Sequence, residues 1–354
     1  LVELDTDLKG VRQGELCSFQ SPEEPPLLAM RLLTQNRLDE ALPPLDLRLA
    51  TTRGTNALLE GKGAKIAFFV TKGFADLLVI GNQQRPDLFE LGIRKRIPLH
   101  ARVFEVDERL DANGNELVPL DEQTVREAAK RCRDEDIESV AVSLMHSYLN
   151  PEHEHRIAEI LKEEGLDRIS LSSELSASIK WVPRAETAVV DAYLAPIMGV
   201  YLDLVELELS DDSLKIMTSS GGLVSRAKYR PKDSLLSGPA GGLVGSSSVG
   251  LRAGFQRSIA FDMGGTSTDV SRFDGRLDYR FEQSIGGARV NAPSLRIETV
   301  AAGGGSICWF DGTALRVGPS SAGASPGPAC YGAGGPLTIT DVNLLLGRLD
   351  AVRF

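Results

Sequence analysis

The chain has 354 residues, which is enough for two or three domains that each bury a core. Hydrophobic residues make up 42% and charged residues 25%, and this balance is that of an ordinary globular protein. The net charge of −10 argues against a nucleic-acid partner or an anionic membrane surface, because both need clustered Lys and Arg, and no apolar run approaches the roughly 20 residues that span a bilayer.

The first elements along the chain alternate between helix and strand. A Pro-rich segment at 21–26 leads into a short helix predicted over 27–33. Leucines alternate with polar residues at 45–49, as in a strand, and a short helix is expected at 58–59. The β-branched and aromatic run at 64–71 is typical of a buried strand.

A hairpin and a crossover unit are predicted next. Asn113-Gly114 tolerates the positive φ of a hairpin turn and is flanked by strand-like residues at 103–110 and 117–118. Helix and strand patterns then alternate over 121–132, 140–145, 150–165 and 169–171. Strand, helix and strand at this spacing predict a right-handed parallel crossover.

The two halves of the chain differ in composition. A long helix is predicted over 186–209, with a kink at Pro196, and from Leu214 onward the chain is rich in Gly, Ser and Thr. Such glycines indicate backbone that approaches a partner closely, or else a loop-rich β domain. We place a boundary within 182–212, which gives an N-terminal lobe of residues 1–185 and a C-terminal lobe of residues 186–354.

The strongest chemical signal lies at 259–271. A strand over 259–261 runs into Asp262-Met263-Gly264-Gly265-Thr266-Ser267-Thr268-Asp269, which predicts a β-hairpin, because a P-loop would need Gly-Lys-Ser/Thr ahead of a helix. Backbone N–H groups at such a Gly-Gly turn, together with its hydroxyls, can hold phosphate without a lysine. Asp262 at the strand end is suited to Mg²⁺. A tight turn capped by Asp and Thr explains the same residues without a ligand.

Two further glycine clusters support this interpretation. Gly303-Gly304-Gly305-Ser306 follows an apolar segment, so its backbone could lie flat against a planar ring or sugar, or it could simply end a helix. Ser237-Gly238-Pro239-Ala240-Gly241-Gly242 predicts a helix start with Ser237 as the N-cap. Its free N–H groups would make another anion site, although close helix packing explains the glycines as well.

The order of these segments resembles that of actin-like ATPases, with a phosphate hairpin followed by an adenosine loop. The chain is moreover similar to the hydantoinase A and 5-oxoprolinase family, which is related to acetone carboxylase β subunits, over residues 48–350 in unbroken order. The strings that carry the resemblance are Thr51-Thr52-Arg53-Gly54-Thr55-Asn56-Ala57-Leu58-Leu59-Glu60, Thr71-Lys72-Gly73-Phe74, Arg85-Pro86-Asp87-Leu88, Met145-His146-Ser147-Tyr148, 237–242, 261–271 and 318–331.

The resemblance implies an α/β chain with the actin-like (ribonuclease H-like) ATPase fold, in two lobes with mixed sheets and flanking helices. It implies ATP and Mg²⁺ as cofactors, with Asp262 and Asp269 as catalytic residues and Asp262 as the metal ligand. The nucleotide-binding residues would be Gly264, Gly265, Thr266, Ser267, Thr268, Gly303, Gly304, Gly305 and Ser306. The substrate residues would be Thr52, Asn56, Arg85, His146 and Gly238.

The implied activity is ATP-dependent hydrolysis of a small cyclic amide, 5-oxoproline or a hydantoin, through phosphorylation of its carbonyl oxygen. A hydantoinase B-type partner subunit or domain is expected, and a homo-oligomer is left open. Two alternatives remain, the nucleotide-binding subunit of an acetone-type carboxylase and a non-catalytic ATP-binding regulator.

The family's first phosphate hairpin is not visible in residues 1–60, and the family pattern continues past Phe354, so we expect a fragment that is incomplete as an ATPase.

Several other polar residues carry weaker signals. His146 follows a buried strand, where ligands gather at the carboxyl ends of parallel strands, although a structural histidine at the strand end is the favoured interpretation. His153 and His155 face different directions on a helix and are expected to be solvated. Arg53 suits either an oxyanion or a surface salt bridge, and Asp341 is expected to cap the helix that follows it.

Cysteine usage bears on the compartment. The four cysteines, Cys17, Cys132, Cys308 and Cys330, show neither disulfide nor metal-ligand spacing. We therefore expect four free thiols and a cytoplasmic location.

Overall fold

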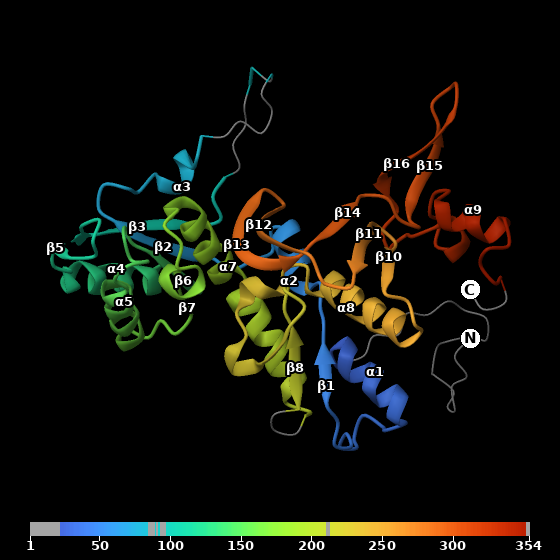
Figure 1. Ribbon diagram of the computed structural model, residues 1–354, viewed down its shortest axis with the longest axis horizontal. Coiled ribbons are helices and arrows are strands. Elements are labelled where there is room, and N and C mark those ends of the chain that lie inside the picture. The colour runs from blue at the N-terminus through green and yellow to red at the C-terminus, as the bar shows by residue number, and fades with distance from the viewer. Residues whose placement is uncertain (1–21, 84–88, 90, 93–96, 210–212, 352–354) are drawn as a thin grey trace.

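The structure is a computed structural model that describes residues 22–83, 89, 91–92, 97–209 and 213–351. Figure 1 shows an elongated molecule, with a parallel sheet at one end, the long helix α7 (Trp181–Glu206) near the middle and a set of antiparallel hairpins at the other end. The predicted helix over 186–209 is confirmed, and it begins five residues earlier than expected.

The N-terminal lobe is built on a four-stranded parallel sheet in the order β3-β2-β6-β7. The strands are β2 (Ile66–Thr71), β3 (Arg102–Val106), β6 (Ser139–Ser143) and β7 (Ile169–Leu171). Every residue of β2 and β6 is buried, because α4 (Glu122–Asp134) and α5 (Glu152–Glu163) cover one face and α7 covers the other. The predicted parallel crossover is confirmed.

The alternation of side chains along β2 explains how two cores form on one sheet. Phe68 and Val70 pack in the core that contains α7, and Ala67 and Phe69 pack in the core that contains α4 and α5.

The predicted strand over 103–110 is wrong in one respect, because β3 ends at Val106 in the parallel sheet. A separate hairpin of β4 (Arg109–Leu110) and β5 (Glu116–Val118) then forms around Gly114, whose φ is +85°.

A three-stranded sheet joins the N-terminal segment to the second half of the chain. Its order is β1-β8-β9, and β1 (Leu47–Leu49) lies parallel to β8 (Leu214–Met217), which pairs with β9 (Leu223–Ser225). The short helices α1 (Pro25–Thr34) and α2 (Arg53–Leu59) and the 3-10 turns Arg226–Lys228 and Pro231–Ser234 lie in this part of the molecule, whereas α3 (Leu77–Ile80) and α6 (Ser172–Leu175) pack against α7. The β1–β8 pair thus brings residues near the start of the chain next to residues beyond α7.

The second half of the chain, beyond β9, consists mainly of antiparallel pairs. β10 (Arg257–Met263), β11 (Thr268–Asp274) and β14 (Ile297–Val300) form one sheet, against which α8 (Ser237–Arg252) packs. The remaining elements are β12 (Tyr279–Ile285), β13 (Ala288–Leu295), β15 (Ser306–Phe310), β16 (Leu315–Ser321), the 3-10 turn Ala329–Tyr331 and α9 (Ile339–Leu345). In Figure 1 the β15–β16 hairpin projects away from the rest of the lobe.

Among the described residues, α7 alone is long and apolar enough to cross a membrane by length and composition. However, 67% of its most apolar window is buried inside the protein, as in the core helix of a globular domain. Of the four cysteines, Cys132, Cys308 and Cys330 are free thiols as predicted, whereas Cys17 lies outside the described residues.

Candidate functional site

The glycine hairpin, formed by β10, β11 and the turn at residues 264–267, has the predicted geometry. Met263 pairs with Thr268, and the N–H of Gly264 donates to Ser267 O at 2.9 Å. Within the described residues, the N–H groups of Gly265, Thr266 and Ser267 donate no hydrogen bond. Gly264, Gly265 and Thr266 are exposed, so the turn offers a set of neighbouring donors that an anion can reach.

The glycine loop, residues 303–305, packs directly against this turn. The N–H of Gly304 donates to Gly264 O at 2.9 Å, and that of Gly305 donates to Gly265 O at 2.7 Å. A Cβ at position 303 would lie 2.6 Å from Gly264 O, which is too close for any side chain. Gly303 and Gly305 are therefore required for contact between two backbone segments, a reason that the sequence analysis did not consider.

The hydroxyl groups of the site divide into two kinds. Thr268 and Ser306 are buried and already occupied, since Thr268 Oγ1 donates to Ala302 O at 2.5 Å and Ser306 Oγ accepts from Gly303 N–H at 3.0 Å. They hold the glycine loop in place. Thr266 is exposed and Ser267 is half-buried at the tip of the turn, so these two remain able to contact a ligand.

The two predicted catalytic carboxylates have different surroundings. Asp262 is exposed, and its Oδ2 lies 4.0 Å from where a Cβ would stand at Gly242 on α8. Asp269 accepts a hydrogen bond from Thr299 Oγ1 at 2.6 Å and thereby joins β11 to β14. Within the described residues, no group of three or more His, Cys, Asp and Glu side chains could hold a metal. A cation at Asp262 would therefore need ligands from elsewhere, as Mg²⁺ bound to phosphate does.

The start of α8 meets the loop that follows β1. A Cβ at Gly238 would lie 2.8 Å from Thr52 Cγ2, and the N–H of Leu236 donates to Thr55 Oγ1 at 3.0 Å. The predicted N-cap is wrong, because Leu236 occupies that position with φ +59°, whereas Ser237 Oγ donates to Met217 O at 2.6 Å. The structure thus brings Thr52 and Gly238 together, and α8 carries this contact toward Asp262.

Asn56 lies close to Thr52, one helical turn along α2, since its N–H donates to Thr52 O at 2.9 Å, and it is exposed. The remaining predicted substrate residues lie elsewhere. His146 follows β6 in the parallel sheet, with φ +61° and its ring 6.3 Å from that of Tyr148. Arg85 lies outside the described residues. Arg53 forms a 2.6 Å ion pair with Glu24, which agrees with the surface salt-bridge alternative. Asp341 takes part in the cap of α9, but it does not precede the helix as predicted, because Thr338 is the N-cap and Asp341 is the N3 residue of a capping box.

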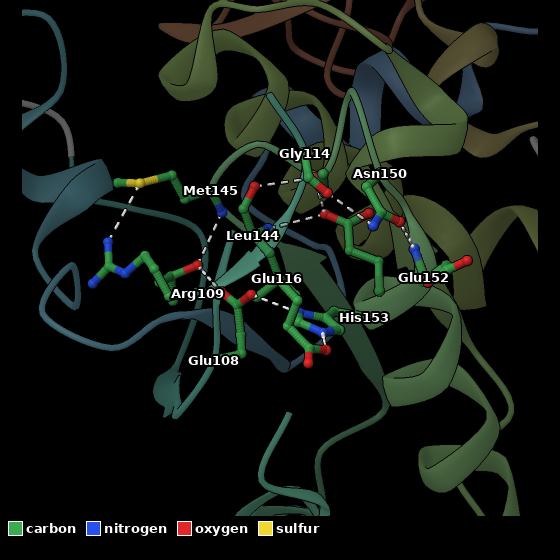
Figure 2. A network of polar contacts seen from close by, with 12 residues as sticks. Glu108, Arg109, Gly114, Glu116, Leu144, Met145, Asn150, Glu152 and His153 are labelled. Carbon is green, nitrogen blue, oxygen red and sulfur yellow. Dashed lines mark hydrogen bonds and ion pairs between the residues drawn. The ribbon is translucent and has the colours of Figure 1, made fainter. Parts of the chain in front are cut away.

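A buried histidine network escaped the sequence analysis (Figure 2). His153 is not solvated as predicted, since it is 7% exposed and its ring lies between two carboxylates. Nδ1 lies 2.9 Å from Glu108 Oε2 and Nε2 lies 2.9 Å from Glu116 Oε2. The hydrogen bond to Glu108 raises the pKa of His153 above its ordinary value, against the opposing effect of burial. No signal near His153 in the sequence announces these partners, because Glu108 and Glu116 stand 45 and 37 residues away.

Two profiles of the hydantoinase/oxoprolinase family match most of the chain. The profile of the hydantoinase/oxoprolinase N-terminal region matches residues 27–165, and that of hydantoinase/oxoprolinase matches residues 184–354. The chain is 44% identical to 5-oxoprolinase of Saccharomyces cerevisiae over 92% of its own length and 28% of that protein's. It is 33% identical to the acetophenone carboxylase gamma subunit of Aromatoleum aromaticum, over 88% of its length and 46% of that subunit's.

Two solved structures share the fold. The ATP-dependent caprolactamase from Pseudomonas jessenii superimposes with a TM-score of 0.74 at 31% identity, over 96% of this chain and 52% of that one. Nucleotide-free acetone carboxylase gives a TM-score of 0.69 at 27% identity, over 86% and 46%. The chain therefore has the actin-like ATPase fold that its motifs predicted, and it spans about a quarter of the 5-oxoprolinase length and about half of each solved chain.

Proposed function

Since the chain belongs to the hydantoinase/oxoprolinase family, we propose that it forms the nucleotide-binding part of an enzyme that opens a cyclic amide with ATP. The observation that carries the proposal is the pairing of the glycine hairpin with the glycine loop. This pairing leaves the N–H groups of residues 265–267 without partners in the described part of the chain, on an exposed turn. Such a turn can receive phosphate oxygens without a basic side chain.

The residues present fit a magnesium nucleotide. When bound, ATP supplies the phosphoryl group that activates the amide carbonyl oxygen. The N–H groups of the turn, with Thr266 and Ser267, would hold phosphate oxygens, and Asp262 would hold Mg²⁺ through direct or water-mediated contact. Asp269 keeps β11 and β14 together through Thr299, and thereby orients the turn. The glycine loop supports the turn through its hydrogen bonds to Gly264 O and Gly265 O. That the same loop contacts the adenosine is part of the proposal.

For the substrate we propose a small cyclic amide of the 5-oxoproline type. Several relatives that are 42–45% identical are named 5-oxoprolinases, and the caprolactamase acts on another cyclic amide. Thr52 lies next to Gly238 and Asn56, and the substrate roles of these residues, like those of His146 and Arg85, stay predictions. A hydantoinase B-type partner and a cytoplasmic location belong to the same proposal.

A second function is favoured by specific relatives. The acetophenone carboxylase subunit and acetone carboxylase indicate that this architecture also serves ATP-dependent carboxylation. Their identities to this chain, 33% and 27%, are lower than the 44% of the yeast 5-oxoprolinase, so ring opening is the first choice. A non-catalytic regulator would bind ATP without turnover.

One assay separates these functions. The full-length protein with its partner is given ATP, Mg²⁺ and either 5-oxoproline, a hydantoin, or acetone with bicarbonate, and ADP release and product are measured. We expect ADP release coupled to ring opening of 5-oxoproline. Release coupled only to the ketone would establish the carboxylase, and nucleotide binding without ADP release under every condition would establish the regulator.

A further inference from the structure

Asp341, on the first turn of α9, has a buried carboxylate that accepts four hydrogen bonds. Oδ1 accepts from the N–H of Cys330 at 2.7 Å, and Oδ2 accepts from Ala329 N–H at 3.2 Å and from the N–H and hydroxyl of Thr338 at 2.6 and 2.9 Å. Burial alone would raise the pKa of Asp341, but the hydrogen bonds from Cys330 and Thr338 outweigh it and hold the pKa at about 2. The carboxylate is therefore ionised at neutral pH, and it joins α9 to residues 329–330.

The first turn of α9 is hydrogen-bonded to the glycine loop, which is hydrogen-bonded to the glycine hairpin. Thr340, the residue before Asp341, donates its N–H to Gly304 O at 2.8 Å. Gly304 in turn donates to Gly264 O at 2.9 Å, at the turn of the hairpin. The path from Asp341 to the phosphate-binding turn thus runs through two consecutive backbone hydrogen bonds. The glycine loop and α9 pack tightly at this point, since a Cβ at Gly304 would lie 2.6 Å from Thr340 Oγ1.

We propose that Asp341 is a positioning residue for the phosphate-binding turn. By fixing the first turn of α9, its carboxylate sets where Gly304 stands, and Gly304 sets where the turn presents its free N–H groups. A simple helix cap would stabilise α9 alone, whereas this arrangement predicts an effect on a turn more than seventy positions earlier in the sequence. The inference rests on the proposed function for the identity of the ligand, which is the phosphate chain of ATP.

The test compares Asp341→Asn with a matched control, Asp311→Asn. An asparagine at 341 keeps one acceptor oxygen and turns an NH₂ group toward the donors. Asp311 accepts N–H bonds from Thr313 and Ala314 in the β15–β16 turn, and no described contact joins it to the glycine loop. Amide hydrogen exchange is measured by mass spectrometry on peptides covering 262–268 and 301–306, and the Kd for ATP with Mg²⁺ is measured by titration of the full-length protein.

We expect Asp341→Asn to speed exchange in both peptides and to raise the Kd about tenfold, a size found for residues coupled through a contact network. Asp311→Asn should change neither. If Asp341→Asn lowers the melting temperature while exchange at 262–268 and the Kd for ATP stay as in the wild type, Asp341 is a cap only and the proposal is wrong.

A milder variant keeps the test decisive if Asp341→Asn does not fold. Thr338→Val is close in volume; it removes one of the four donors to Asp341, and with it the hydroxyl that accepts from the Asp341 N–H, while the carboxylate and its other three donors remain. It should speed exchange at 262–268 by a smaller factor, and unchanged exchange there would overturn the proposal. Hydrogen exchange needs no nucleotide, so a wild-type protein that binds no ATP would refute the proposed function but would leave the positioning role of Asp341 to be decided by exchange alone.

Discussion

Replacing His153 by alanine should destabilise the N-terminal lobe through the charge that it leaves behind. The side chain of Glu108 is fully buried, its Oε1 accepts from Thr71 Oγ1, and its Oε2 faces His153 Nδ1 at 2.9 Å. Breaking a buried pair by removing one partner costs about 3–5 kcal/mol, because the remaining charge is uncompensated. Glu116 is half exposed, so its contact adds at most about 1 kcal/mol. We expect a loss of about 3 kcal/mol in the free energy of unfolding.

The assay is urea unfolding followed by the fluorescence of Trp181, which lies at the start of α7 against the sheet, in a Trp309→Phe background that leaves this reporter alone. His155→Ala is the matched control. His155 lies two residues along the same helix but is half exposed, 3.6 Å from Glu174, so its removal should cost less than about 1 kcal/mol. Equal losses for the two variants would refute the role given to His153.

The pH dependence follows from the same pair. The folded-state pKa of His153 is raised, so its charged contact stabilises the fold fully below the unfolded value near 6.5 and loses that contribution as pH rises through the folded pKa. The stability difference between wild type and His153→Gln should therefore shrink as pH rises above neutrality. A difference that grows with pH would show that His153 is neutral in the folded protein.

Three further predictions concern the site and the thiols. Gly303→Ala should overpack the hairpin turn at a cost of about 1–3 kcal/mol and weaken ATP binding, as seen by titration, whereas Gly199→Ala, which meets nothing within 4 Å, should be neutral or stabilising. Asp262→Asn should leave the melting temperature unchanged, since the side chain is exposed, but should slow ATP turnover by the full-length enzyme about 10²-fold; equal turnover at saturating Mg²⁺ would contradict its assignment. Alkylation of the native protein should modify the exposed Cys330 and spare Cys132, whose pKa burial raises to about 12, and unfolding without reductant should expose four reactive thiols by intact mass.

Local patterns in the sequence were sufficient for the elements whose cause is local. The hairpin of β10 and β11 follows from two glycines between alternating residues, and the buried strands β2 and β6 follow from unbroken apolar runs. A cap involving Asp341 was also predicted, although Thr338 is the N-cap and Asp341 completes the capping box from the N3 position. The resemblance of the glycine motifs to one family likewise predicted the actin-like ATPase fold that the solved relatives share.

Only the tertiary structure decided which distant residues meet. The glycine loop needs Gly303 and Gly305 because the hairpin turn lies against it, a contact between segments that no local periodicity encodes. From the helix pattern alone His153 is predicted to be solvated, but the β4–β5 hairpin lies next to it in the fold and supplies Glu116 as a partner. Ser237 has the residue type of an N-cap, yet Met217 O accepts its hydroxyl and Leu236 takes the cap position. In each case the deciding partner is remote in sequence, so propensity and spacing determine the element while burial and hydrogen bonding determine the role of the side chain.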